Sequence, residues 1–270
     1  MLIPALKRTV KRVLPPRATI HLIGLRNYMV GEAEIRMLKY LADPRRDSID
    51  IGCDRGAYAY FLRRLSRKVF CFEPLPASAA FLAAAFSRSA NVSVHPIAVS
   101  DCDSEVTLWV PTGEKTRLLN SSTISPLNPS RDATWDAVKV PARRLDSIVD
   151  SDVGFIKIDV EGHEGAVLAG AERLIRRSRP NLVIEIEQRH LAHDPSQVFG
   201  PLLEQDYRGW FRWEGGLVSI DRFDCAIHQQ VAKLTISNSN YASNFIFTPR
   251  EFAAFPPPAP VRTFRRAQSA

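Results

Sequence analysis

Charged side chains end one apolar segment of this chain, the run Ile-Lys-Ile-Asp-Val-Glu-Gly-His-Glu at 156–164. Its alternation of apolar and charged residues predicts a β-strand in which Lys157 and Asp159 share one face. Glu161 and His163 follow in the turn after that strand. A buried strand that ends in charged groups is costly unless the groups are paired or used. We therefore expect this segment to take part in catalysis or in ligand binding.

A second segment, Ser-Ile-Asp-Ile-Gly-Cys-Asp-Arg-Gly at 48–56, joins a short strand to a glycine-containing turn and a helix. Such a turn binds nucleotides because the backbone and the helix N-terminus can approach a ligand where side chains are missing. Gly52 and Gly56 are four residues apart, so the spacing differs from the Gly-x-Gly-x-x-Gly dinucleotide pattern. With Asp50 ahead of the first glycine and Asp54 inside the turn, the segment suits a nucleoside without a pyrophosphate, such as S-adenosylmethionine (SAM).

Two further strand ends carry polar residues. Glu73 follows the apolar segment 68–72, and a carboxylate there can accept hydrogen bonds from both hydroxyls of a ribose. The less favoured alternative is an acid that caps the helix after Pro74. Ser100 and Asp101 follow the next strand-like segment, where they are placed to meet an adenine amino group. A turn or a helix cap explains that pair almost as well.

These polar residues need a sheet that brings strand ends together. Strand-like and helix-like segments alternate along the chain, which predicts an α/β fold with helices on both faces and a ligand at the carboxyl ends of the strands. We expect strands at 48–52, 68–72, 92–99, 155–160 and 182–186, and helices at 32–42, 57–66, 78–87 and 164–177. Further strand-like segments are 105–110, 137–141, a hairpin turned by Gly215-Gly216, and 244–247. The predicted fold is Rossmann-like, with a mostly parallel seven-stranded sheet and an antiparallel C-terminal hairpin.

Composition and charge limit the alternatives. The chain has 270 residues, of which 45% are hydrophobic, enough for one sizeable core. Its net charge of +7 comes from the two ends, since residues 1–17 hold five Lys or Arg without an acid and residues 249–270 hold four Arg against one Glu. The part between is close to neutral, so we expect no nucleic-acid partner. Four cysteines without a regular spacing, no apolar run of membrane-spanning length and no secretory signal lead us to expect a cytoplasmic protein.

Five segments together resemble the FkbM-type methyltransferases. They are Ile-Asp-Ile-Gly at 49–52, Phe-Glu-Pro at 72–74, Ala-Val-Ser-Asp at 98–101, the run at 156–164 and Ile-Glu-Ile-Glu at 184–187. The resemblance covers about residues 30–250. It implies a class I SAM-dependent methyltransferase and, typically, O-methylation of hydroxyls on sugars, polyketides or related products. Cys53, Asp54 and Arg55 depart from the family, which often has Ala-Asn and a small residue there, and His163 stands where Ala is common.

The resemblance, taken with the strand ends, implies two sets of site residues. The SAM-binding set is Asp50, Gly52, Asp54, Gly56, Glu73, Ser100 and Asp101. The catalytic set is Lys157, Asp159, Glu161 and His163. Methyl transfer to a hydroxyl needs a positioned acceptor and help in removing its proton.

Within the catalytic set, Asp159 or His163 is the hypothesised base, and Lys157 orients Asp159 or stabilises the developing alkoxide. Glu161 and Glu185 are expected to bind acceptor hydroxyls or to support the groups that do. The reserve candidates for the base are His190 and His193. A divalent metal held by Asp159, Glu161 and Glu187 is less favoured than a metal-free mechanism, because no spacing forces the three together.

The acceptor is expected to be a sugar hydroxyl in a glycolipid, oligosaccharide or polysaccharide, with a polyketide-like small molecule as the alternative. We expect a basic arm at 1–30, a methyltransferase domain at 31–250 and a Pro-rich disordered tail at 251–270. Residues 101–150 form an insertion that is expected to cover the strand ends as an acceptor lid, with 120–123 offering hydrogen bonds. The arm is expected to pack as a helix on the domain edge, with a weak peripheral membrane contact as the alternative and no transmembrane segment.

Two other classes of protein compete with this prediction. An NAD-linked oxidoreductase is disfavoured because the third glycine of the dinucleotide pattern is missing. A non-catalytic SAM-binding scaffold is disfavoured because it has no use for acids such as Asp50, Glu73 and Asp159 at successive strand ends.

Overall fold

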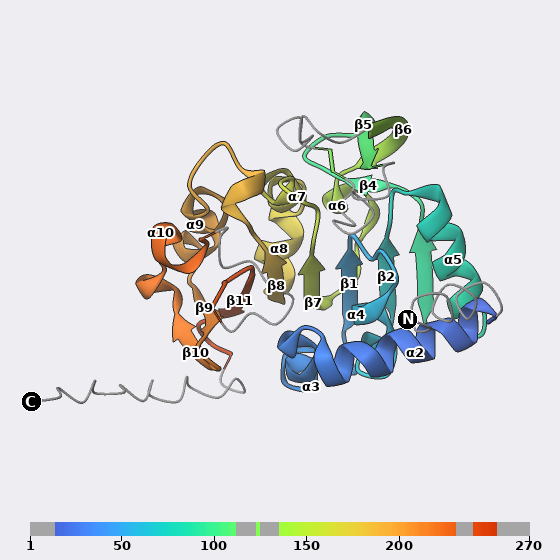
Figure 1. The fold of residues 1–270 in the computed structure, drawn as a ribbon, viewed down its shortest axis with the longest axis horizontal. Coiled ribbons are helices and arrows are strands. Elements are labelled where there is room, and N and C mark those ends of the chain that lie inside the picture. Colours follow the sequence, from blue (N-terminus) through green and yellow to red (C-terminus); the bar gives the residue numbers. More distant parts are fainter. Residues whose placement is uncertain (1–13, 112–122, 125–134, 231–239, 253–270) are drawn as a thin grey trace, which may run out of the picture.

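The computed structural model describes residues 14–111, 123–124, 135–230 and 240–252. At its centre lies an eight-stranded sheet with the order β10-β9-β11-β8-β7-β1-β2-β3 (Figure 1). Strands β3, β2, β1, β7 and β8 run parallel, and β11, β9 and β10 are antiparallel to their neighbours. The strands are β1 (Asp47–Ile51), β2 (Val69–Phe72), β3 (Val92–His95), β7 (Val153–Ile158), β8 (Asn181–Glu185), β9 (Tyr207–Trp213), β10 (Gly216–Ser219) and β11 (Asn244–Pro249).

This sheet confirms the predicted α/β fold with a mostly parallel sheet and antiparallel strands at its C-terminal edge. It has eight strands where seven were expected, because the predicted hairpin adds β10 at the edge. The hairpin turns at Glu214 and Gly215, one residue earlier than the expected Gly215-Gly216, and these two residues have positive φ, at 49° and 81°. That conformation is the one that a tight two-residue hairpin turn requires.

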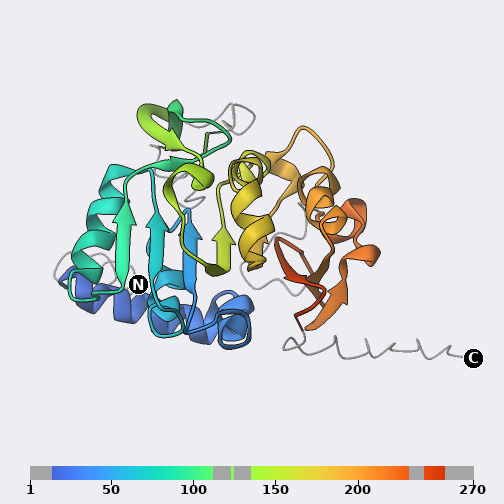
Figure 2. The same cartoon turned by 180° about the vertical axis from the view of Figure 1, so that it is seen from behind.

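Helices cover both faces of the sheet (Figures 1 and 2). One face packs against α2 (Pro16–Val30), η1 (Ala33–Met37), α3 (Leu38–Leu41), α4 (Ala57–Leu62) and α5 (Pro76–Phe86). The other packs against α6 (Leu145–Ile148), α7 (Glu164–Gly170), α8 (Glu172–Ser178) and α9 (Ser196–Glu204). Short helical segments complete the C-terminal part, namely η3 (Gln188–His190), η4 (Ile220–Arg222) and α10 (Cys225–His228).

Strand β1 shows how the sequence divides its side chains between these two faces. Ile49 and Ile51 are buried in the core that α7, α8 and α9 cover. Asp50, between them, points to the opposite face, where its Oδ2 atom accepts a hydrogen bond from the Ala59 N–H of α4 at 2.9 Å. Period-two alternation therefore places Asp50 beneath helix α4.

Three predicted elements differ from the structure, and the first is the helix expected at 164–177, which is divided into α7 and α8. The single strand expected at 92–99 is divided into β3 and β4 (Ala98–Val99), and Pro96 lies in the break. Proline lacks the N–H that a sheet ladder needs, so the chain leaves the large sheet there. Strand β4 instead joins a second sheet with β5 (Ser104–Pro111) and β6 (Trp135–Arg143) in the order β4-β6-β5. The helix expected at 32–42 is a 3₁₀ turn, η1, followed by the short helix α3.

The small sheet lies beyond the carboxyl ends of β1 and β2 (Figures 1 and 2). Strand β1 has β2 on one side and β7 on the other, so the chain reverses its direction of winding there. In open α/β sheets, that reversal marks the crevice where ligands bind.

The turn after β1 requires its two glycines. Gly52 has φ 75°, and a Cβ atom there would lie 1.7 Å from the carbonyl oxygen of Asp159. Gly56 has φ 74° and precedes α4, and a Cβ atom there would lie 2.7 Å from Cδ2 of Leu82. Gly52 therefore lets the ends of β1 and β7 approach, and Gly56 lets α4 start close to α5.

Within the residues that the structure describes, no helix combines the length and the apolar character needed to cross a bilayer.

Candidate active site

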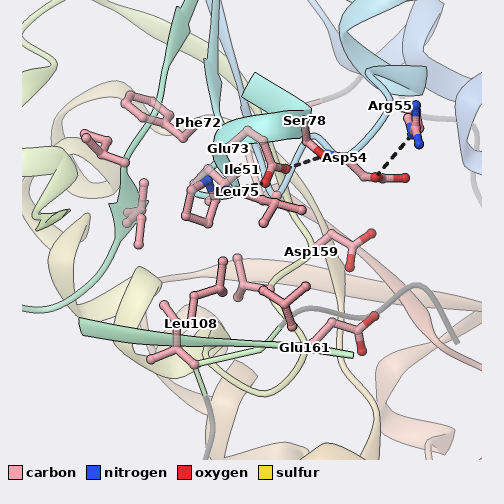
Figure 3. A pocket seen from close by; sticks show the side chains of 18 of the residues that line it. Ile51, Asp54, Arg55, Phe72, Glu73, Leu75, Ser78, Leu108, Asp159 and Glu161 are labelled. Carbon is pink, nitrogen blue, oxygen red and sulfur yellow. Dashed lines mark hydrogen bonds and ion pairs between the residues drawn. The ribbon is translucent and has the colours of Figure 1, made fainter. Parts of the chain in front are cut away.

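A cavity of about 750 Å³ lies at the carboxyl ends of β1, β2 and β7, between the large sheet and the insertion (Figure 3). Residues from all of these elements line it: Ile51, Gly52, Asp54, Arg55, Phe72, Glu73, Pro74, Leu75, Ser78, Ile97, Ala98, Val99, Leu108, Val110, Pro111, Ile124, Asp159, Val160 and Glu161. Five predicted site residues are among them, namely Gly52, Asp54, Glu73, Asp159 and Glu161. The size and the mixture of apolar walls with a few polar groups are typical of a small-molecule site.

Glu73 follows β2 and is held by backbone N–H groups from the turn after β1 and from its own segment. Its Oε2 atom accepts a hydrogen bond from the Asp54 N–H at 2.8 Å, and its Oε1 atom accepts one from the Leu75 N–H at 2.9 Å. Burial raises the pKa of Glu73 to about 7, and the two N–H groups oppose that shift. Each carboxylate oxygen keeps a lone pair, so the residue can still accept bonds from vicinal hydroxyls.

The three residues between Gly52 and Gly56 have different positions: one is buried and two lie at the rim of the cavity. Cys53 is buried, and its thiol contacts the carbonyl oxygen of Asp50 at 3.0 Å. Asp54 and Arg55 lie at the rim of the cavity, 3.9 Å apart, and both are more than half exposed (Figure 3). The charged pair that departs from the family pattern therefore lies at the entrance.

Asp159 and Glu161 line the cavity from the segment after β7 (Figure 3), and the buried Lys157 pairs with Asp159. The Nζ atom of Lys157 is 3.7 Å from Oδ2 of Asp159 and 3.9 Å from Oε2 of Glu185. Burial raises the pKa of Asp159 to about 7, Lys157 opposes that shift, and the charge of Glu161 adds to it. A carboxyl group with a pKa near neutrality can accept a proton and release it again.

A buried polar network holds Lys157 in place. Its Nζ atom donates a hydrogen bond to Oδ1 of Asn244 in β11 at 2.9 Å. The amide of Asn244 donates to Oε2 of Glu32 at 3.3 Å, and the hydroxyl of Tyr58 donates to the same oxygen at 2.6 Å. Lys157 also lies 5.1 Å from the centre of the Tyr58 ring. The ammonium group is therefore oriented by residues from three separate parts of the chain.

Neighbouring residues hold both the backbone and the carboxylate of Glu161 in place. Its φ is 52°, a left-handed conformation that is uncommon for a residue with a side chain. The hydroxyl of Thr123, from the insertion, donates to the Glu161 carbonyl oxygen at 2.7 Å. The buried His190 places its Nε2 atom 2.8 Å from Oε2 of Glu161. These contacts direct the carboxylate into the cavity.

The described lining of the cavity does not include Asp50, Gly56, Ser100, Asp101, Lys157 or His163. His163 instead contacts Ser100, with 2.9 Å between its Nε2 atom and the serine Oγ, and burial lowers the pKa of the imidazole. The Ser100 hydroxyl also donates to Oδ1 of Asp101 at 3.1 Å. The expected adenine partners and the alternative base therefore contact one another at the end of β4 and the start of α7.

The insertion, the segment before β4 and the segment between β2 and α5 supply an apolar wall that the sequence pattern did not indicate. Its members are Leu75, Ile97, Leu108, Val110 and Ile124. Strand β5 was expected, but its alternation alone did not show which face would meet the site. Of the polar loop expected at 120–123, Thr123 contacts Glu161, and residues 120–122 lie outside the described residues.

The acids considered as ligands of a divalent metal contact different residues. Glu187 pairs with Arg189 through bonds of 2.8 and 2.9 Å and accepts a bond from the Tyr241 hydroxyl at 2.7 Å. No group of three or more His, Cys, Asp or Glu that could hold a metal ion occurs in the described parts of the chain.

The fold is a mostly parallel α/β sheet, and its cavity lies at the carboxyl ends of β1, β2 and β7, where sheets of this kind bind ligands. The family model of the methyltransferase FkbM domain matches residues 50–208. The chain belongs to this family of SAM-dependent methyltransferases, which confirms the predicted class of enzyme. That assignment favours a methyltransferase over the oxidoreductase and scaffold alternatives.

Two similar proteins extend the comparison. The chain is 26% identical over 157 residues to the 2-O-methyltransferase NoeI of Sinorhizobium fredii (strain NBRC 101917 / NGR234), a match that covers 53% of this chain and 65% of NoeI, less than two thirds of that relative. The crystal structure of methyltransferase FkbM from Methylobacillus flagellatus KT superposes with a TM-score of 0.51 at 18% identity. This superposition covers 91% of the chain and 58% of the other protein, and it supports the fold.

Proposed function

We propose that this chain transfers the methyl group of SAM to a hydroxyl of a sugar in a glycolipid, oligosaccharide or polysaccharide. The observation that carries the proposal is the Asp159 carboxylate, which opens into the cavity and is backed by the buried ammonium group of Lys157. The similarity to NoeI, a 2-O-methyltransferase, supports methylation of oxygen.

The residues around the turn fit the cofactor. Glu73 offers two carboxylate oxygens for the ribose hydroxyls, and the turn at Gly52 leaves room at the end of β1. Leu75 and Ile97 give apolar surface suited to a flat base. When bound, SAM supplies an electrophilic methyl group on a positively charged sulfur. The acidic lining formed by Glu73, Asp159 and Glu161 complements that charge.

Asp159 is proposed as the base. Its carboxylate accepts the proton of the acceptor hydroxyl, and its pKa near 7 suits proton transfer at neutral pH. Lys157 keeps the carboxylate oriented through the 3.7 Å ion pair. Glu161, held by His190 and Thr123, is proposed to accept a hydrogen bond from a neighbouring hydroxyl and so to orient the acceptor.

The test is turnover with radiolabelled SAM on a panel of glycosides, with a parallel panel of polyketide-like alcohols. The expected result is label in a sugar O-methyl group, which NMR of the product assigns to one hydroxyl. Asp159→Asn should abolish this label while SAM binding by calorimetry persists. Transfer only to the polyketide-like alcohols would refute the sugar acceptor, and transfer to nitrogen would refute the proposed chemistry.

A further inference from the structure

The outward face of α2 is apolar although it lies on the protein surface. Ile20 and Gly24 face inward, and a Cβ atom on Gly24 would lie 2.4 Å from the Tyr60 ring. Leu22, Leu25 and Met29 face outward and are 51%, 57% and 68% exposed. Their spacing of three and four residues puts them in one stripe along the helix. A surface helix normally has polar residues at such positions, so this stripe calls for a partner.

The stripe is continued at the end of the helix. Val30 is 72% exposed, Tyr28 is 49% exposed, and Tyr40 of the neighbouring α3 is 46% exposed. Strongly exposed large apolar side chains in the described chain are few elsewhere, with Ile148 and Ile227 as the separate examples. The exposed apolar surface is thus concentrated on α2 and its surroundings.

The charges beside the stripe are all positive. Helix α2 contains Arg17 and Arg26 and no Asp or Glu. Arg26 is exposed next to Leu25 and Met29. The sequence that leads into the helix adds four cations, namely Lys7, Arg8, Lys11 and Arg12. A partner must therefore offer negative charge at its surface and an apolar layer beneath it.

A second copy of the chain does not meet both requirements. A two-fold contact through α2 would bring together two copies of a helix that contains arginine and no acid, and like charges repel. An anionic lipid surface offers phosphate groups to the cations and acyl chains to the stripe. We propose that α2 docks this methyltransferase on an anionic membrane surface, with Leu22, Leu25 and Met29 inserted at the level of the lipid headgroups.

Docking of this kind leaves the cavity accessible. Helix α2 lies near the end of the sheet at which the parallel strands begin, whereas the cavity lies at their carboxyl ends (Figures 1 and 2). The membrane contact stands independently of the acceptor proposed above, since it rests on the surface of α2 and on the charges beside it.

The experiment is cosedimentation of the full chain with vesicles of phosphatidylcholine, alone or with about a third phosphatidylglycerol. We expect binding to the anionic vesicles, weakened by added salt because the Debye length shortens. The double variant Leu25→Ser/Met29→Ser should bind at least about tenfold more weakly, since two large apolar side chains no longer insert. Arg26→Ala should bind about fivefold more weakly, the effect of one cation near a charged membrane.

The double variant Ile148→Ser/Ile227→Ser is the matched control, because it removes two exposed apolar side chains away from α2. It should bind as the parent chain does. Equal binding by the α2 double variant would overturn the proposal, as would binding to neither kind of vesicle. Light scattering supplies a further check: a dimer that the α2 double variant dissociates would identify a second copy as the partner and would refute the lipid contact.

Discussion

The ammonium group of Lys157 lies 3.7 Å from the carboxylate of Asp159, with the lysine side chain 1% exposed and the aspartate facing the cavity. Burial alone would lower the pKa of Lys157, but the carboxylates of Asp159, Glu32 and Glu185 outweigh it and raise that pKa. The lysine therefore stays charged. A buried cation that holds a carboxylate at the wall of a cavity is a device for orienting a base.

Replacement of Asp159 by Asn is expected to lower kcat by about 10²–10⁴-fold, the usual contribution of a general base. The amide keeps the size of the side chain but cannot accept the proton. Single-turnover methyl transfer from labelled SAM measures the loss, and calorimetry should find SAM binding within a few-fold of the parent.

His163→Ala is the matched comparison for that variant, because the imidazole contacts Ser100 and lies outside the described lining of the cavity. It should keep most of the activity. A loss of activity as large as that of Asp159→Asn would indicate that His163, and not Asp159, is the base.

The value of kcat/KM should rise as the pH increases through about 7. Only the deprotonated form of Asp159 can accept the hydroxyl proton, and burial raises its pKa to about 7, so activity is lost as pH falls through that value. Measurement of kcat/KM at a series of pH values checks this, because kcat/KM reports the pKa values of the free enzyme. A flat profile between pH 5 and 8 is incompatible with Asp159 as the base.

Asn244→Ala is expected to shift the pH at which kcat/KM rises. It should also lower kcat more than it raises KM. The variant removes the 2.9 Å bond to Lys157 and leaves the ammonium group less well oriented toward Asp159. Asn181→Ala is the control, because Asn181 is also a buried asparagine of the sheet but donates to the Leu41 carbonyl oxygen at 2.8 Å. Both variants should lose stability, measured by urea unfolding, and Asn244→Ala alone should change the pH profile. Identical pH profiles for the two variants would mean that Asn244 contributes to packing and does not orient Lys157.

The sequence could predict those parts of the site that one short segment encodes. Lys157 and Asp159 are two residues apart in a strand, so their shared face follows from the period of the strand. Asn244 and Glu32 reach Lys157 from far along the chain, and only the pairing of β11 with β8 and the position of η1 bring them there. The contact of Ser100 with His163 was not indicated by the sequence for a related reason, since Pro96 ends β3 and the chain then enters a second sheet.

Glu73→Gln is expected to weaken SAM binding by about 10- to 100-fold, because a buried charge-assisted hydrogen bond is worth about 1.5–3 kcal/mol. Glutamine has one acceptor oxygen where Glu73 uses two to hold the N–H groups of Asp54 and Leu75. Calorimetric titration with SAM measures the effect. Glu105→Gln, at an exposed ion pair with Lys139, should leave the affinity unchanged. Equal affinities in all three proteins would remove Glu73 from the cofactor site.

Glu164→Gln is expected to stabilise the fold at high pH and not at low pH. The side chain is buried at the start of α7, where its Oε1 atom accepts a bond from the Gly162 N–H at 2.9 Å and its Oε2 atom has no hydrogen-bond partner among the described residues. Burial raises its pKa to about 7, whereas the unfolded chain has the ordinary value near 4.3. Between those values the folded chain binds the extra proton, so the free energy of unfolding falls as pH rises through this window.

Glutamine keeps the acceptor for Gly162 and does not titrate, so it removes that fall. The difference in unfolding free energy between the variant and the parent should therefore grow from near zero at pH 4 to on the order of 4 kcal/mol above pH 7. Urea unfolding at a series of pH values measures it. Glu172→Gln, at an exposed i,i+4 pair with Arg176, is the control and should change stability by less than about 0.5 kcal/mol throughout. A difference that does not depend on pH would mean that Glu164 carries its charge at no cost, and the cause would then have to be the packing of the amide.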